Sequence, residues 1–292
     1  MKTFTPKDLE TKDLHAHLLG AIGPRPIAFA STVNKDGVPN LSPYSFFNVF
    51  SANPPILIFS PARRVRDNTT KHTLQNCEET KEVVINIVNY NIVQQMSLSS
   101  TEYPEGVNEF VKSGLTALDS DIVQPPRVKE SPVHFECKVK DIIYLGNEGG
   151  AGNLVIAEVV KLHIAEDILD DNGKIDQHKI DQVARMGGNW YTRANQGLFE
   201  VQKPLTSLGI GVDHIPEDIK FSKVLTGNDL GKLGNIEKLP TEEEINTLIK
   251  EENLKEYILN ENDEDIHYKA QEYLKSKDVF SAWCILLAKN LN

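Results

Sequence analysis

Two pairs of strand-like segments, each joined by a glycine-containing turn, constrain the fold most. Residues 26–33 (PIAFASTV) form an apolar run, and the turn Asn34–Gly37 folds it back onto residues 38–45. Farther along, residues 133–145 and 153–166 are long strand-like segments separated by a glycine cluster. Together with apolar runs at 56–60 and 82–89, the two hairpins predict a mainly β fold, a barrel core with peripheral helices.

Helical patterns are local in the first two thirds of the chain and dominant after Pro204. We expect helices over 71–80 and over 96–112, the second broken at 103–106. Past Pro204 the chain becomes more acidic, and apolar residues recur every three or four positions. Thr241 begins this part as a helix cap, with Glu244 as its capping-box partner. The pattern predicts one domain over residues 1–204 and a C-terminal extension of two to four amphipathic helices over residues 205–292.

The role of the extension stays open at this stage. One interpretation is an auxiliary layer packed on the barrel; the other is a module that docks a partner protein through the apolar stripe 279–288. A docked core helix is the commoner outcome for such a stripe.

Charge and cysteine content narrow the classes of function. The net charge of −11, with no basic stripe, excludes a nucleic-acid-binding protein. No apolar run approaches the ~18 residues needed to span a bilayer, and the polar N-terminus does not resemble a signal peptide. Three widely spaced cysteines without a CxxC motif fit a reducing compartment. We therefore expect a soluble cytoplasmic protein that does not bind membranes.

Several motif-like segments fail on inspection. The glycine cluster 146–152 leads into a strand rather than a helix, so a hairpin loop is favoured over a phosphate-binding loop. His15 and His17 lack a third ligand, and Asp170–Gly173 lacks the spacing of a calcium loop. Cys77 has no obvious basic partner to activate it. The sequence predicts neither a metal site nor a catalytic nucleophile.

Three segments carry more polar groups than a barrel core requires. Residues 23–32 end in two hydroxyls, residues 40–48 alternate small polar groups with aromatics, and residues 60–73 combine cations with hydroxyls. Arginine forks, hydroxyls and a helix N-terminus suit a phosphate, although a solvated loop is the plain alternative. Taken together the segments indicate a ligand with a flat ring at one end and a phosphate at the other, such as a nucleotide-like cofactor.

The order of these blocks resembles a known family. GPRPIAFAST, NLSPYSFFN, NPPILIFSPARR, KHTLQNCEETKEVVINIV and ARMGGNWYTR follow one another as in the flavin reductase-like FMN-binding proteins of the split-barrel superfamily. That group includes flavoredoxin and the reductase partners of two-component monooxygenases. The resemblance covers roughly residues 15–200, and it implies a split β-barrel and a homodimer with FMN bound non-covalently at the subunit interface.

The resemblance also implies which residues hold the cofactor. Ser31 and Thr32 would line it from the first strand, and a second set would lie along the flavin ring and ribityl chain: Ser42, Tyr44, Ser45, Phe46, Phe47 and Asn48. Four residues would hold the phosphate: Ser60, Arg63, Lys71 and Thr73. A late block would approach the cofactor or substrate: Arg185, Gly187, Gly188, Asn189 and Tyr191. His72 departs from the family, which usually has Asp between the Lys and the Thr.

The implied activity is reduction of flavin by NADH or NADPH, with electrons passing on to oxygen, free flavin or a protein partner such as a monooxygenase. The chemistry would belong to the flavin, so no catalytic side chain is expected. Two alternatives remain. One is a flavin-binding electron carrier or sensor that does not oxidise NAD(P)H, and the other is a structural dimer without ligand.

Overall fold

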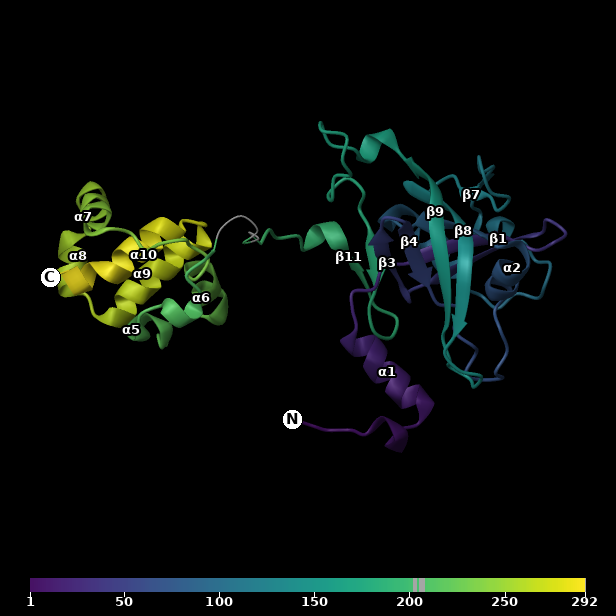
Figure 1. The fold of residues 1–292 in the computed structure, drawn as a ribbon, viewed down its shortest axis with the longest axis horizontal. Helices are drawn as coiled ribbons and strands as arrows, with labels where there is room; N and C mark the ends of the chain where they lie inside the picture. Colours follow the sequence, from purple (N-terminus) through teal and green to yellow (C-terminus); the bar gives the residue numbers. More distant parts are fainter. Residues whose placement is uncertain (202–203, 205–207, 292) are drawn as a thin grey trace. The chain divides into compact units, whose positions relative to one another are not determined.

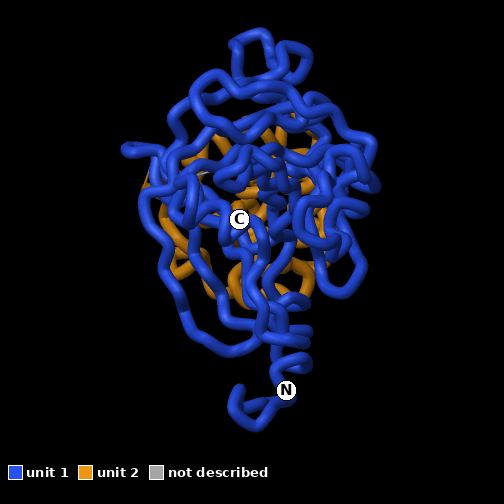
Figure 2. The backbone as a smooth tube through the Cα atoms, turned by 90° about the vertical axis from the view of Figure 1, so that its right-hand side faces the viewer, with its two compact units in different colours: residues 1–199 blue, residues 200–292 orange. Residues whose placement is uncertain are grey.

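The computed structural model describes residues 1–201, 204 and 208–291, and it divides into two compact units, residues 1–199 and 200–292 (Figure 2). The domain boundary expected at residue 204 stays a prediction, because most of residues 202–207 lie outside the described part.

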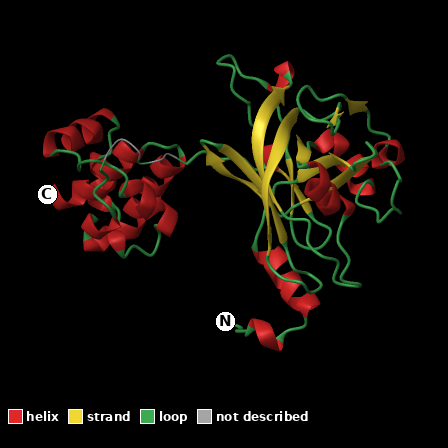
Figure 3. Ribbon diagram, turned by 45° about the vertical axis from the view of Figure 1, so that its right-hand side comes forward, coloured by secondary structure: helices red, strands yellow, loops and turns green. Residues whose placement is uncertain are grey.

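The first unit is mainly β, as predicted. Its strands are β1 (Ala28–Val33), β2 (Pro39–Tyr44), β3 (Phe47–Ala52), β4 (Pro55–Phe59), β5 (Glu82–Ile87), β6 (Ala117–Leu118), β7 (Arg127–Val128), β8 (Val133–Tyr144), β9 (Asn153–Ile164), β10 (Val183–Arg185) and β11 (Tyr191–Arg193). Seven of them form one antiparallel sheet in the order β2-β1-β5-β8-β9-β4-β3. Figure 3 shows this sheet as strongly curved.

Both predicted hairpins are present. β1 pairs with β2 from Val33↔Pro39 to Ala28↔Tyr44, around the turn in which Gly37 has φ 79°. β8 and β9 form the longest pairing of the sheet and lie side by side in Figure 1. Their apolar residues on one face pack against α2 and the neighbouring strands, which places one core between the sheet and that helix.

The segment 40–48 divides between two strands. The expected return strand of the first hairpin, residues 38–45, corresponds to β2, which ends at Tyr44, and β3 begins at Phe47. Ser45 and Phe46 form a bend between them. The break sends the chain from one edge of the sheet to the other, since β2 and β3 are its two outermost strands.

The helices of the first unit are α1 (Thr11–Ala21), α2 (His72–Thr80), α3 (Val93–Leu98) and α4 (Glu109–Ser113). The predicted helix over 71–80 is confirmed as α2. The prediction of helix over 96–112 with a break at 103–106 is confirmed only in part, because α3 ends at Leu98 and α4 begins at Glu109, so the interruption covers residues 99–108. α2 packs against β1, with Leu74 and Cys77 buried. α1 has no buried residue and lies apart from the sheet in Figure 1.

The second unit is helical, with α5 (Glu217–Lys220), α6 (Gly227–Leu233), α7 (Glu242–Glu251), α8 (Lys255–Asn260), α9 (Asp263–Lys275) and α10 (Val279–Ala288). Four of them, α7 to α10, follow Thr241 and agree with the two to four helices predicted from the repeating apolar pattern, and the two short helices α5 and α6 come in addition. Turns at Asn253 and Lys277, both with positive φ, separate α7 from α8 and α9 from α10. The capping box of Thr241 and Glu244 is present.

The apolar stripe 279–288 forms the centre of the second unit's core. Trp283 is fully buried in α10, and its Nε1 donates to the carbonyl of Leu233 at 3.0 Å. The interpretation of this stripe as a docking surface was therefore wrong: α7, α9 and the other helices of the same unit already cover it.

All three cysteines are free thiols and all are buried. Among the described residues, no helix combines the length and apolar character needed to cross a membrane.

Candidate functional site

The loop between β4 and α2, residues 60–71, contains the positively charged residues noted in the sequence analysis, and we call it the basic loop. Arg63 is fixed within this loop, because its Nε and Nη2 atoms donate to the side-chain and main-chain oxygens of Asn68, each at 2.6 Å. Asn68 has φ 57°, a left-handed conformation that Asn tolerates better than most residues. The guanidinium of Arg63 thus holds the loop in shape.

Three neighbouring cations, which we call the cation cluster (Arg64, Arg66 and Lys71), converge on Glu102. Arg64 Nε and Lys71 Nζ lie 3.1 and 3.6 Å from Glu102 Oε1, and Arg66 Nη2 lies 3.0 Å from Oε2. Burial, reinforced by repulsion from Arg64, lowers the pKa of Lys71. Sequence reasoning missed Glu102 because no local pattern marks an acid in a loop as the partner of a basic segment elsewhere.

The glycine cluster supports the basic loop. Gly150 donates its amide to the carbonyl of Arg63 at 3.0 Å, and Arg63 donates to Ala151 at 2.9 Å. A Cβ at Gly149 would meet the carbonyl oxygens of Val65 and Arg64 at 3.0 and 3.1 Å. The predicted hairpin loop is confirmed, and its glycine allows two backbones to approach more closely than any side chain would permit.

The N-terminus of α2 lies beside the same loop. Lys71 is its N-cap residue, and no described side chain accepts a hydrogen bond from the first amides of the helix. Thr70 Oγ1 does not cap the helix and accepts instead from Gln75 Nε2 at 3.0 Å. The first turn of α2 therefore keeps donors and a positive dipole end available to an anion.

The hydroxyls of β1 are fully buried. Thr32 Oγ1 accepts from Asn76 Nδ2 of α2 at 3.0 Å. Ser31 Oγ has no hydrogen-bond partner among the described residues. A buried hydroxyl without a partner is unusual in a folded protein, and it fits a position that completes its hydrogen bonding with a ligand.

Tyr44 and Thr73 lie in a buried polar network. Tyr44 Oη donates to Thr73 Oγ1 at 2.9 Å, and Thr73 Oγ1 donates to Asn40 Oδ1 at 2.7 Å. Glu109 completes the network, accepting from Asn40 Nδ2 and from the amide of Leu41, each at 3.0 Å. Burial raises the pKa of Tyr44 to about 12, so its hydroxyl remains a donor. The network braces α2 and α4 against β2.

Ser60 joins the end of β4 to β9. Its Oγ accepts the amide of Asn153 at 3.0 Å, and Asn153 Nδ2 donates to the carbonyl of Pro61 at 2.8 Å. Asn153 Oδ1, like Ser31 Oγ, is buried without a partner among the described residues. A Cβ at Gly152 would come within 3.0 Å of Ser60 Oγ. Ser60 thus lies at the contact between the basic loop and the glycine cluster.

The remaining residues of the segment 40–48 lie in β2, in the bend that follows it and at the start of β3. Ser42 is partly buried in β2, and Ser45 Oγ lies 3.4 Å from Arg25 Nε. Phe46 is 40% exposed, Phe47 packs against the core beside α2, and Asn48 is exposed. The bend therefore separates buried aromatic surface from exposed aromatic surface.

Arg25 connects the late block, residues 185–191, to the first of the three polar segments, residues 23–32. Arg25 Nη2 donates to the carbonyl of Met186 at 2.8 Å, and the backbones of Arg25 and Arg185 pair. The guanidinium of Arg185 lies 4.6 Å from the ring centre of Tyr191, whereas Asn189 is exposed between them in sequence. Among the described residues no hydrogen bond or ion pair joins this block to the basic loop.

A cluster of possible metal ligands joins β8, β9 and the segment between β6 and β7. Ligand atoms of Asp121, Glu136 and His163 lie within 4.8 Å of one another. The carboxylate of Glu136 accepts from the amides of Asp121 and Ile122 at 2.9 and 2.7 Å and lies 2.7 Å from His163 Nε2. Lys161 pairs with Asp121. The hydrogen bonds and this cation already satisfy the acids, so the cluster braces the strands.

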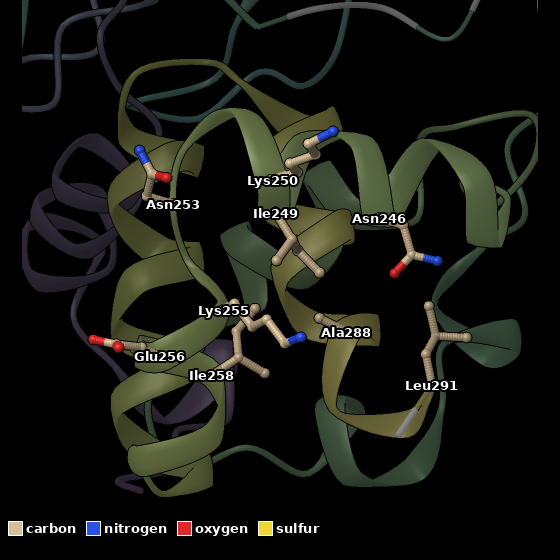
Figure 4. Close-up of a pocket in the computed structure, with 9 residues that line it drawn as sticks. All are labelled: Asn246, Ile249, Lys250, Asn253, Lys255, Glu256, Ile258, Ala288 and Leu291. Carbon is tan, nitrogen blue, oxygen red and sulfur yellow. The ribbon is translucent and has the colours of Figure 1, made fainter.

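A cavity of about 700 Å³ lies in the second unit (Figure 4). Ile249, Ile258 and Ala288 form its apolar lining, and the Lys255 side chain extends over them. The polar ends of Asn253 and Glu256 point away from it in Figure 4. Convergent polar groups, which small-molecule sites usually have, are lacking among the described lining residues.

Comparison with known proteins identifies relatives of the first unit. The profile of the "Flavin reductase like domain" matches residues 21–179. An uncharacterised protein of Halalkalibacterium halodurans is 37% identical over 206 residues, which cover 70% of this chain and 97% of that protein.

Solved structures give the same result. Nitrilotriacetate monooxygenase component B from Bacillus cereus has a TM-score of 0.65 and 32% identity, covering 69% of this chain and 98% of the other. A protein from Shewanella frigidimarina, described as a flavin reductase with a split barrel domain, has a TM-score of 0.58 and 27% identity, covering 68% and 96%. The expected split-barrel fold is confirmed.

Proposed function

Because the chain belongs to the flavin reductase-like family of split-barrel proteins, we propose that it is an FMN-binding oxidoreductase that takes hydride from NADH or NADPH. The observation that carries this proposal is the meeting of Arg64 and Lys71 with the uncapped N-terminus of α2. Cations and free amides at one place suit a phosphate monoester.

The donor set also fits the rest of the ligand. Ser31 Oγ and Asn153 Oδ1 are buried polar atoms without partners among the described residues, and Phe46 offers an exposed aromatic surface. Of the residues that the resemblance assigned to the cofactor, we propose that Lys71, Ser31, Ser45, Phe46 and Asn48 face it. Tyr44, Thr73 and Arg63 would act from behind, by holding β2, α2 and the basic loop in position.

Bound FMN would supply the redox chemistry, accepting hydride from the nicotinamide and delivering electrons onward. The protein binds the phosphate, orients the ring and limits access of water. The final acceptor we propose is a partner protein such as a monooxygenase, because component B of a monooxygenase is among the similar structures. Cytoplasmic location is part of the proposal, since three buried free thiols suit a reducing compartment.

Flavin titration tests the binding step. Purified protein is expected to quench FMN fluorescence on binding and to bind riboflavin, which lacks the phosphate, more weakly. Arg64→Met should weaken FMN binding roughly tenfold or more through loss of a charged hydrogen bond, with riboflavin unchanged. Lys35→Met, which removes the same charge from an exposed turn, is the control. Equal binding of FMN and riboflavin by the native protein would contradict the phosphate site.

Rapid mixing tests the reductase step separately. When the FMN-loaded protein is mixed with NADH or NADPH, the flavin absorption band should bleach rapidly, as the bound FMN is reduced in a single turnover. Slow or absent bleaching with both nucleotides, in a protein that binds FMN, would instead support an electron carrier or sensor.

A further inference from the structure

The carboxylate of Glu102 lies among the three residues of the cation cluster. Both of its oxygens are engaged, Oε1 by Arg64 and Lys71 and Oε2 by Arg66. Asp67 balances Arg66 from the other side, at 3.0 Å. Three cations held this close repel one another, so the cluster requires an anion at its centre.

Glu102 lies in a loop and makes few contacts, so another anion could take its place at the cation cluster. It belongs to the loop between α3 and α4, residues 99–108, and its side chain is 43% exposed. Within this loop the backbone amides of Tyr103 and Val107 donate to the carbonyls of Thr101 and Pro104, so these hydrogen bonds stay inside the loop. The described contacts of the Glu102 carboxylate are all with the cation cluster. Removing it therefore costs those ion pairs and little else.

We propose that Glu102 is a resident counter-anion that the phosphate of the flavin displaces, and that this exchange determines how strongly the protein discriminates phosphorylated from unphosphorylated flavin. The inference rests on the proposed function, because it takes the cation cluster as the phosphate site. Without ligand, Glu102 neutralises the cluster and holds the loop against it. With ligand, the phosphate takes over the three cations and releases the loop.

The net charge of the site favours a phosphate that replaces Glu102 over a phosphate that binds beside it. The cluster carries three positive charges against the two carboxylates of Glu102 and Asp67. A phosphate monoester carries about −1.5 to −2 at pH 7, so adding it while both carboxylates stay would leave the site with a net charge of about −0.5 to −1. Exchange of Glu102 for the phosphate leaves the site close to neutral. Riboflavin brings no anion and so leaves Glu102 in place.

Binding to three proteins tests the exchange. Native protein, Glu102→Gln and Glu105→Gln are titrated with FMN, riboflavin and inorganic phosphate. Glu105 lies in the same loop, is exposed and makes no ion pair among the described residues, so its variant controls for net charge. We expect Glu102→Gln to bind FMN and phosphate about tenfold more tightly, with riboflavin unchanged and Glu105→Gln like the native protein.

Hydrogen exchange of the native protein gives a second measurement that needs no variant. Amides of residues 99–107 are expected to exchange faster when FMN is bound, while those of α4 stay unchanged. Slower exchange of the loop with FMN, or unchanged or weaker FMN binding by Glu102→Gln, would show that Glu102 is a fixed tie and overturn the inference. If FMN fails to bind any of the three proteins, the proposed function fails instead, and inorganic phosphate alone then tests the exchange.

Discussion

His134, in β8, shows how one buried side chain links stability to pH. It is 7% exposed, and its Nδ1 lies 2.8 Å from Asn86 Oδ1, which also accepts the amide of Val128. Burial, reinforced by the nearby charges of Arg127 and His163, lowers the pKa of His134 to about 4. The imidazole is therefore neutral in the folded protein across a range in which an unfolded histidine is charged.

The sign of the pH effect follows from this difference. Between pH 6.5 and about 4 the unfolded chain binds a proton at His134 that the folded chain does not, so the free energy of unfolding falls as the pH falls. The loss should reach about 3 kcal/mol by pH 4. Urea unfolding at pH 7, 6, 5 and 4.5 should show a flatter dependence for His134→Gln than for the native protein. Exposed His178→Gln serves as control, and a slope unaltered by His134→Gln would refute the assignment.

Residue types in the basic loop were predictable, but their individual roles were not. The cations of the segment 60–73 are evident in the sequence. Their partners are not, because Arg63 donates to Asn68 of the same loop whereas Arg64 pairs with Glu102. That choice depends on the left-handed conformation of Asn68. Glu102 and Glu109 act on residues far away in sequence, so only the folded chain reveals them.

At the level of elements, hairpins could be predicted more fully than edges. Alternating runs around a turn with Gly37 specify local pairing, and the structure has that register. The step from β2 to β3, by contrast, depends on which sheet edge each strand joins, a long-range property that residues 40–48 do not encode locally. Likewise, the helical pattern of the second unit was clear, but not where turns interrupt it.

The contact between the glycine cluster and the basic loop leads to a prediction at this scale. Gly149→Ala would push against the backbone of Arg64 and Val65, so it should lower the free energy of unfolding by about 1 kcal/mol or more and weaken FMN binding. Urea unfolding and FMN titration measure both effects. Gly197→Ala, where an added Cβ meets nothing within 4 Å, should change neither. Native FMN affinity in Gly149→Ala would argue against this support.

At the scale of the whole molecule, the first unit presents exposed apolar surface. Val49 and Phe50 are 62% and 63% exposed on β3, an outermost strand of the sheet, and α1 buries none of its residues. Exposed edge strands with apolar side chains are typical of protein interfaces. From this surface we propose the homodimer that the family resemblance implies.

A charge placed on that strand should separate the subunits. We expect Phe50→Lys to shift the protein from dimer to monomer in analytical ultracentrifugation at micromolar concentration, because burying an unpaired ammonium opposes association. Val111→Lys alters a residue that is 76% exposed on α4 and should leave the dimer intact. A native protein that sediments as a monomer, or a Phe50→Lys dimer, would remove the proposal.

The burial of all three cysteines, Cys77, Cys137 and Cys284, makes it practical to label the loop that contains Glu102. Burial raises the pKa of each thiol and keeps it from reagents in solution, so maleimide dyes should leave the native chain unlabelled. A single cysteine introduced at exposed Glu105 would then accept a fluorophore selectively. Single-molecule spectroscopy could follow loop opening in an otherwise wild-type background.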